Sequence, residues 1–243
     1  MFTPDGPEPA GFGHCGTCAY RRNGTAEGCF TCARARLEEL APNRCDSCDQ
    51  KLPASGKCGN PLCGRPVQQR GWDYIWAIAM RSGQLKATIS AYKYNDKKGW
   101  AWIYGRILVG YLELGAEIFS RYDMIIPMPT FVGVGGRSWD HIGTIVDRAA
   151  MEGPDWPFRR GVMSKVNATP RSVGLTFGQR AQMVETQLRP ALRVDRPDLV
   201  AGKDILVFDD VFTAGLTLRE VAFKLRSAGA SSVAGIVLAR QPY

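Results

Sequence analysis

Two adjacent carboxylates and a run of small, hydroxylated residues lie together in residues 205–217, ILVFDDVFTAGLT. An apolar stretch leads into Asp209 and Asp210, and threonines flank a glycine soon after them. Short apolar runs of this kind are typical of buried strands, and the glycine indicates a turn. The pattern therefore predicts a strand, a turn and a helix N-terminus, with both aspartates leaving the end of the strand.

This arrangement predicts a site for a phosphorylated sugar. Backbone N–H groups at a helix N-terminus bind anions, and Gly215 lets a phosphate approach the backbone closely. The hydroxyls of Thr213 and Thr217 are further donors. Two neighbouring carboxylates would repel the phosphate unless they bind something else. The vicinal hydroxyls of a ribose, with a bridging divalent cation such as Mg²⁺, meet that requirement.

All eight cysteines lie within the first 63 residues, which predicts a metal-binding module. They are Cys15, Cys18, Cys29, Cys32, Cys45, Cys48, Cys58 and Cys63. A two-residue gap lets both sulfurs of a pair reach one tetrahedral ion, so eight ligands predict two structural zinc ions. Sequential pairing assigns the first four cysteines to one ion and the last four to the other. An interleaved cross-brace uses the same ligands and stays open.

The rest of the chain alternates apolar strands with amphipathic helices, which predicts an α/β domain with a parallel sheet flanked by helices. A change in composition near residue 70 divides the chain into a cysteine-rich module, 1–70, and this α/β domain, 71–243. Strands are expected within 72–80, 122–130, 161–166, 204–208 and 232–240, and helices within 33–40, 83–94, 100–119, 138–151, 176–187 and 217–229. Thr217 and Glu220 fit a capping box, and Gly229 fits the residue after a helix end.

The segment VFDDVFTAGLT resembles the signature of type I phosphoribosyltransferases. The resemblance implies that Asp209 and Asp210 contact the ribose hydroxyls of phosphoribosyl pyrophosphate (PRPP), and that the following loop binds its 5-phosphate. The implied loop residues are Thr213, Ala214, Gly215, Leu216 and Thr217. The family commonly has a second threonine where this chain has Ala214, so one phosphate donor is missing while the backbone amides remain.

Over nearly its whole length the chain is similar to the ComF family of competence-associated proteins, in which cysteine pairs precede such a domain. The matching segments are YKY (92–94), IIPMP (125–129), GRSWDHI (136–142), TPRSVGLTFGQR (169–180) and the 207–217 signature. By this resemblance the turn after IIPMP is a pyrophosphate loop and Arg137 is its nearby cation. RSWDH replaces a more usual Arg-Gly-Phe-Asn-Gln-like run, which leaves the role of those side chains open.

A phosphoribosyltransferase needs cations around the diphosphate, usually with Mg²⁺. Besides Arg137, the candidate cations are Lys93, Arg171 and Arg180, and residues 152–175 form a candidate hood over the ligand. His14 and His141 are the chain's two histidines, so a histidine base would have to be His141. The acceptor is not indicated by any residue.

A non-catalytic role in DNA uptake is the alternative, with single-stranded DNA or the uptake machinery as partner. The basic and aromatic residues 92–102 could stack bases and meet phosphates, or form a solvated helix end. The net charge of +8 argues weakly for DNA, because two tetrathiolate zinc sites would lower it to about +4. The N-terminus lacks a secretory signal pattern and no apolar run is long enough to insert in a membrane, so a cytoplasmic location is expected.

Overall fold

The computed structural model describes residues 37–95, 97–170 and 174–242. They form an α/β fold around a four-stranded, entirely parallel sheet with the strand order β1-β6-β5-β2. The strands of this sheet are β1 (Ile75–Met80), β2 (Met124–Pro127), β5 (Asp204–Phe212) and β6 (Ser232–Arg240). The strong burial of β5 and β6 explains their nearly uninterrupted apolar sequences, because parallel strands in the middle of a layered fold are covered on both faces. The predicted fold class is confirmed.

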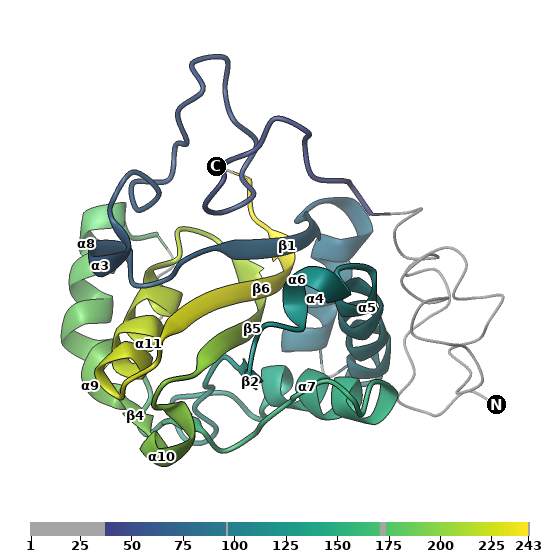
Figure 1. The fold of residues 1–243 in the computed structure, drawn as a ribbon, viewed down its shortest axis with the longest axis vertical. Coiled ribbons are helices and arrows are strands. Elements are labelled where there is room, and N and C mark those ends of the chain that lie inside the picture. Colours follow the sequence, from purple (N-terminus) through teal and green to yellow (C-terminus); the bar gives the residue numbers. More distant parts are fainter. Residues whose placement is uncertain (1–36, 96, 171–173, 243) are drawn as a thin grey trace, which may run out of the picture.

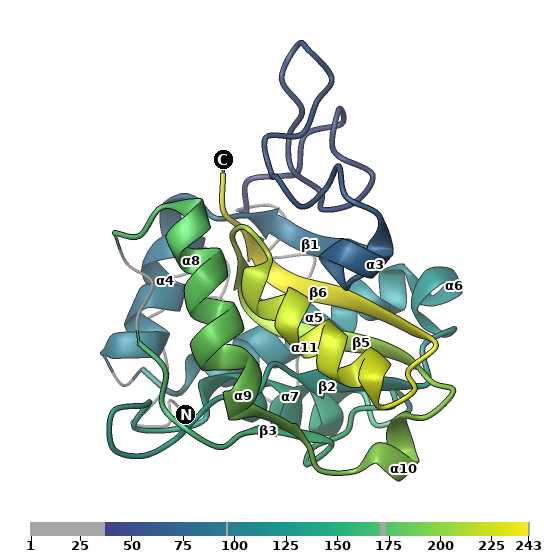
Figure 2. The same cartoon turned by 90° about the vertical axis from the view of Figure 1, so that its left-hand side faces the viewer.

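Helices cover both faces of the sheet (Figure 1). One layer contains α5 (Trp100–Leu114), α6 (Ala116–Phe119) and α7 (His141–Glu152), and α4 (Gly83–Tyr94) connects this layer to β1. The other layer contains α11 (Leu216–Ser227), beside which α8 (Phe177–Met183) lies in both views (Figure 2). Short helices complete the fold: α3 (Val67–Arg70), α9 (Arg189–Ala191) and α10 (Pro197–Val200).

A small second sheet lies beside the main one. It pairs β3 (Met163–Lys165) with β4 (Leu192–Val194) in antiparallel register. Between these two strands the chain forms α8, a π-helical turn η1 (Val184–Leu188) and α9. This excursion lies beside the N-terminal part of α11, so it brings residues distant in sequence to the loop that follows β5.

Residues 37–66 run as loops along the outer edge of the main sheet (Figure 1). The N–H of Ile75 on β1 donates to the carbonyl of Ser47 (3.0 Å), and the N–H of Ala77 donates to Oδ2 of Asp49 (2.9 Å). Asp49 is almost fully buried and also accepts the Tyr74 hydroxyl at 2.8 Å. The segment therefore closes an edge strand whose backbone groups would otherwise be unpaired. The predicted boundary near residue 70 stays a prediction.

Three sequence expectations about element ends are wrong. Strand β5 does not stop at Phe208 but continues through both aspartates, because Asp209 and Val211 still pair with Val237 and Ala239 of β6. The stretch 100–119 is two helices that meet at Gly115, where a side chain would collide with the Phe119 ring.

The expected helix start near residue 138 is early by three residues: helix α7 begins at His141, because Asp140 is the N-cap and accepts the N–H of Gly143 (2.9 Å). Residues 37–40 are not helical, and the remainder of the expected 33–40 helix lies outside the described residues.

The expected capping box at Thr217 and Glu220 is also wrong. Helix α11 begins after Gly215, which has a left-handed backbone and no side-chain cap. Glu220 is instead fully buried, where Arg189 Nε donates to it at 2.5 Å and Arg219 Nε at 2.9 Å. A carboxylate surrounded by two guanidiniums cannot also bond to the start of its own helix. Gly229 does follow the helix end with a φ of +95°, as expected.

Candidate functional site

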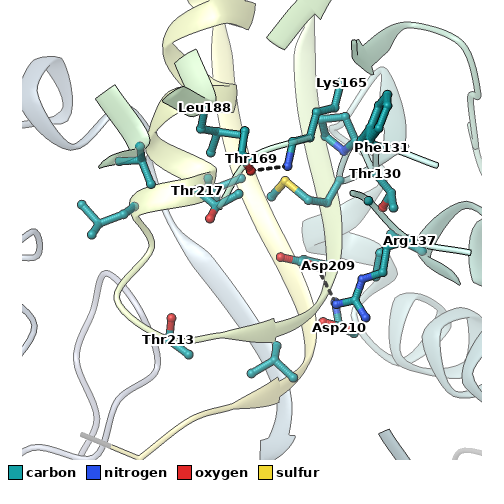
Figure 3. Close-up of a pocket in the computed structure, with 18 of the residues that line it drawn as sticks. Thr130, Phe131, Arg137, Lys165, Thr169, Leu188, Asp209, Asp210, Thr213 and Thr217 are labelled. Atoms are coloured by element: carbon teal, nitrogen blue, oxygen red, sulfur yellow. Dashed lines mark hydrogen bonds between the residues drawn. The ribbon is translucent and has the colours of Figure 1, made fainter. Parts of the chain in front are cut away.

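A cavity of about 450 Å³ lies at the carboxyl ends of β2 and β5. Figure 3 shows the loop after β5 on one side of it and Arg137 and Phe131 on the other. Ligands of parallel α/β sheets bind at this end of the strands. The cavity is lined by these residues that the sequence singled out: Lys93, Arg137, His141, Arg180, Asp209, Asp210, Thr213, Ala214, Gly215, Leu216 and Thr217. Arg171 lies outside the described residues.

The two aspartates have different environments, and Asp210 is the one held by the protein itself. Its side chain is buried, and Lys93 Nζ lies 2.7 Å from the carboxylate. His141 Nε2 lies 3.4 Å from Oδ2. Burial would raise the pKa of Asp210, but the charge of Lys93 and the contact with His141 outweigh it, so the pKa is well below its usual range. Asp210 is therefore an ionised, paired carboxylate.

Asp209 is partly exposed toward the cavity (Figure 3). Within the described residues its carboxylate makes no ion pair and accepts one hydrogen bond, from the Asp210 N–H at 2.9 Å. Burial, followed by the charge of Asp210, raises the pKa of Asp209 from 3.8 to about 7. Because burial disfavours the charged form of Asp209, a hydroxyl donor or a cation in the cavity would stabilise its carboxylate.

The loop after β5 has the geometry of an anion site. Gly215 adopts a φ of +79°, and the N-terminus of α11 follows it. Thr213 and Thr217 are exposed at this loop, whereas Ala214 is buried. A Cβ on Gly215 would lie 2.5 Å from the Phe212 ring, so glycine is required here by both backbone conformation and space. Backbone N–H groups and two hydroxyls are thus available to a phosphate.

Cationic side chains line the opposite wall of the cavity. The Arg137 guanidinium lies over the ring of the exposed Tyr94, 5.1 Å from its centroid. Arg180 reaches the cavity from α8, and its buried Nε has no hydrogen-bond partner within the described part of the chain. An unpartnered buried guanidinium N–H is costly in the free protein and is satisfied by an anionic ligand.

The sequence named Lys165 as a basic residue of the candidate hood and Thr169 as part of a matching segment, but it did not predict that they meet at the cavity (Figure 3). Lys165 Nζ donates to Thr169 Oγ1 at 2.6 Å, and both residues line the cavity. Burial and then the charge of Arg137 lower the pKa of Lys165. Both residues lie in the segment 152–175 that the sequence proposed as a hood, but only the pairing of β3 with β4 brings Lys165 to the cavity. A short strand of three residues has no sequence signal strong enough to reveal that pairing.

The described residues of 92–102, which exclude residue 96, do not form an exposed stacking surface. Tyr92 and Trp100 are buried in the core, and Lys93 is paired with Asp210. The Tyr92 hydroxyl donates to the carbonyl of His141 (2.6 Å), which holds α4 against α7. Tyr94, Lys97 and Lys98 are exposed. The aromatic residues of this string therefore mostly build the domain, as a helix end and its loop.

The described cysteines converge on one point. The Sγ atoms of Cys45, Cys48, Cys58 and Cys63 all lie within 4.8 Å of one another, as ligands of a single metal ion would. This is the second set of the sequential pairing; the first set, Cys15 to Cys32, lies outside the described residues. The N–H of Ser47 donates to Cys45 Sγ (3.4 Å) and that of Asn60 to Cys58 Sγ (3.5 Å).

The thiols of this cluster have pKa values shifted in opposite directions. The pKa of Cys48 is lowered to about 5 by a hydrogen bond from Cys63 and by Arg240. Burial and the neighbouring thiolates raise the pKa of Cys58 to about 11. Four thiolates can coexist at this distance only around a cation, so the donor set and its spacing fit a divalent metal ion.

Comparison with known proteins agrees with the resemblance seen in the sequence. No protein-family model matches the chain. Competence protein F of Haemophilus influenzae is 25% identical over 228 aligned positions, covering 87% of this chain and 96% of that protein. The similarity to the ComF family is thereby confirmed, and it spans both the cysteine segment and the α/β domain. Across the described residues, every helix is too short or too polar to cross a bilayer.

Proposed function

We propose that this protein binds PRPP with Mg²⁺ in the cavity at the end of β5 and transfers its phosphoribosyl group to an acceptor. The observation that carries the proposal is the convergence of three features on one cavity: an uncompensated carboxylate, an amide-lined turn with two hydroxyls, and several cations. A sugar with a phosphate, a diol and a diphosphate has one chemical group for each feature.

The 5-phosphate is assigned to residues 213–217, where the helix N-terminus and the hydroxyls of Thr213 and Thr217 face the cavity. The ribose diol is assigned to Asp209, whose carboxylate is the less compensated of the pair. Asp210 has a supporting role, because its ion pair with Lys93 orients both groups beneath the ligand.

The diphosphate is assigned to the turn at residues 129–137 with Arg137, and Lys165 and Arg180 are additional cations at the same cavity. Asp209 would hold a Mg²⁺ ion together with the ligand, and the ion would supply positive charge that stabilises the leaving group. The cations stabilise the charge that develops on the departing diphosphate as its bond to the sugar breaks. The apolar side chains of Met183, Val184 and Leu188 limit water near the sugar.

The cysteines are assigned a structural role with zinc. A four-cysteine set with two buried and two half-buried sulfurs matches closed tetrahedral zinc sites, which hold no open position for chemistry. We extend this assignment to Cys15, Cys18, Cys29 and Cys32 by their spacing, giving two ions. The proposal requires a reducing compartment such as the cytoplasm, because thiolates and not disulfides bind zinc.

The decisive experiment measures pyrophosphate release from PRPP and Mg²⁺ with a panel of nucleobases and small amines as acceptors. The proposal predicts acceptor-dependent release that is lost in Asp209→Asn/Asp210→Asn. Melting curves with and without PRPP separate binding from turnover: a saturable rise in melting temperature without pyrophosphate release would retain the PRPP site and remove the transferase activity from the proposal.

A role in DNA uptake is the second candidate, and the similarity to Competence protein F is the observation that favours it. In this alternative the protein binds single-stranded DNA or a component of the uptake machinery, and the cavity serves no catalysis. Titration with fluorescent oligonucleotides at increasing salt tests it, since phosphate contacts give a steep salt dependence. Tight, salt-sensitive DNA binding together with no response to PRPP would favour this function over the first.

A further inference from the structure

Arg240, the last residue of β6, is fully buried between the cysteine cluster and the loop after β5. Figure 1 shows this end of β6 next to the loops of residues 37–66. A buried guanidinium is costly unless all its donors are satisfied, and its partners therefore identify what it holds together. Apart from the carbonyl of the adjacent Gln241 (2.8 Å), the partners of Arg240 belong to two sites that are far apart in the sequence.

On the metal side, Arg240 bonds to the first cysteine pair of the cluster. Its Nε donates to the Cys48 carbonyl at 2.9 Å, and its Nη2 lies 3.4 Å from Cys48 Sγ. A divalent ion with four thiolates has a net charge of about −2. The guanidinium is the buried positive charge beside it, and its N–H orients one sulfur ligand.

On the loop side, Arg240 bonds to the residues that lead into the anion site. Its Nη1 donates to the Thr213 carbonyl at 2.8 Å and lies 3.1 Å from the Phe212 carbonyl. The guanidinium also lies 4.8 Å from the centroid of the Phe212 ring. That ring packs directly beneath Gly215, and Trp72 meets its edge. Arg240 therefore helps to hold the turn at 213–215, together with the Gln241 N–H, which donates to the Phe212 carbonyl at 2.9 Å.

We propose that Arg240 is a positioning residue that couples metal binding at Cys45, Cys48, Cys58 and Cys63 to the geometry of the phosphate loop, residues 213–217. With metal bound, the thiolate of Cys48 fixes the guanidinium, which fixes the carbonyls of Phe212 and Thr213. Loss of the metal removes the charge that opposes Arg240 and releases the loop. The ligand part of this inference rests on the proposed function, whereas the coupling itself does not.

Hydrogen–deuterium exchange of the full chain tests the coupling without any ligand. Cys58→Ser removes a ligand of this site that makes no bond to Arg240, so an effect on the loop must come through the metal and Cys48. We expect amides 212–217 to exchange about 10-fold faster in Cys58→Ser than in the metal-loaded wild type, with β5 residues 204–208 unchanged. Equal exchange of 212–217 in the two proteins would overturn the proposal.

Variants of Arg240 separate positioning from simple stabilisation. Arg240→Lys keeps the buried charge, but a single ammonium cannot bond to Cys48 and to both loop carbonyls. We expect it to fold, to retain its metal, and to show fast loop exchange whether metal is present or not. Tyr74→Phe is the matched control, because it loosens Asp49 of the same segment from β1 without touching the loop. Slow, wild-type exchange of the loop in Arg240→Lys would contradict the proposal.

Linkage provides a second test with PRPP and Mg²⁺ as the probe. If metal binding tightens PRPP binding by a given factor, PRPP must raise the metal affinity by the same factor. We expect about a 10-fold factor in both directions for the wild type, from calorimetry and from equilibrium competition with a chromophoric chelator, and less than about 2-fold for Arg240→Lys. PRPP binding that ignores the metal would overturn the coupling and leave the proposed function intact. If the loop responds to metal but the protein binds no PRPP, the coupling stands and the proposed function is overturned.

Discussion

The cysteine cluster and the cavity both concentrate ionisable groups, but they complete their electrostatics differently. The four sulfurs come from Cys45 to Cys63 and converge on one point, so a single divalent ion can bind all four and offset half of their negative charge. The cavity collects its groups from Lys93 to Leu218. Among the described residues it leaves Asp209 without an ion pair and the Arg180 Nε without a hydrogen-bond partner. In our proposal the first site is complete with a structural ion, whereas the second requires a ligand that carries both phosphate and hydroxyl groups.

Loss of a metal ligand should have the largest effect of any change that tests this comparison. Cys45→Ser opens the four-sulfur set, and we expect it to lose one bound ion per chain and more than about 3 kcal/mol of unfolding free energy. Elemental analysis and thermal melts measure the two quantities. Lys51→Ala, an exposed change in the same segment, is the control and should be neutral. Unaltered metal content in Cys45→Ser would refute the described ligand set.

The next largest effect is expected at the buried ion pair beneath the cavity. Lys93→Met leaves the Asp210 carboxylate buried without its main counter-charge. We expect the unfolding free energy to fall by about 3 kcal/mol at pH 7. Lys203→Met removes the exposed ion pair with Asp123 and should cost less than about 1 kcal/mol. Urea denaturation of both variants gives the difference. Similar losses for the two would mean that Asp210 is solvated and that the cavity floor is not built as described.

Gly215→Ala tests the turn of the anion site. The backbone φ of +79° is strained for alanine, and the added methyl group would collide with the Phe212 ring. We therefore expect the unfolding free energy to fall by about 2 to 3 kcal/mol. Gly202→Ala isolates the conformational part, because its φ is +72° and its surroundings are open; about 1 kcal/mol is expected there. Chemical denaturation measures both. If Gly215→Ala costs no more than Gly202→Ala, the close packing of the turn is refuted.

The smallest expected effect is the pH dependence of Asp209. Because its pKa is raised from 3.8 to about 7, the folded state holds a proton that the unfolded state has released, and this stabilising contribution is lost as the pH rises through 7. Asp209→Asn removes the cost of ionising a buried carboxyl group. At pH 8 the unfolding free energy of the variant should therefore exceed that of the wild type by on the order of 1 kcal/mol. The difference should vanish near pH 4. Melts from pH 4 to 8 test this, and a constant difference across that range would contradict the raised pKa.

Much of the fold could be predicted from the sequence, because local signals agree with tertiary structure in most elements. The helix at 83–94 and the strand at 232–240 have the predicted bounds. The end of β5 could not be predicted, since two aspartates argue against a strand locally and only pairing with β6 keeps them in one. The role of Glu220 was mispredicted as a helix cap because its actual partner, Arg189, is close only in the folded protein.

In the candidate site, too, residues with a local sequence signal were predicted and residues that depend on the fold were not. Cysteine spacing is a local signal and predicted the four ligands that converge, and the 207–217 signature predicted the loop. The place of Lys165 at the cavity and the role of Arg240 were not predicted, because both depend on neighbours that are close in space and not in sequence. For Arg240 a weak signal existed, since an arginine at the end of an apolar strand must find buried partners.

Calorimetric titration of PRPP with Mg²⁺ tests the central claim most directly, when the wild type is compared with Asp209→Asn. The account predicts saturable binding of one PRPP per chain to the wild type and an affinity at least about 10-fold weaker for the variant. Absence of binding to a folded, metal-loaded wild type, or equal affinity in the two proteins, would contradict it.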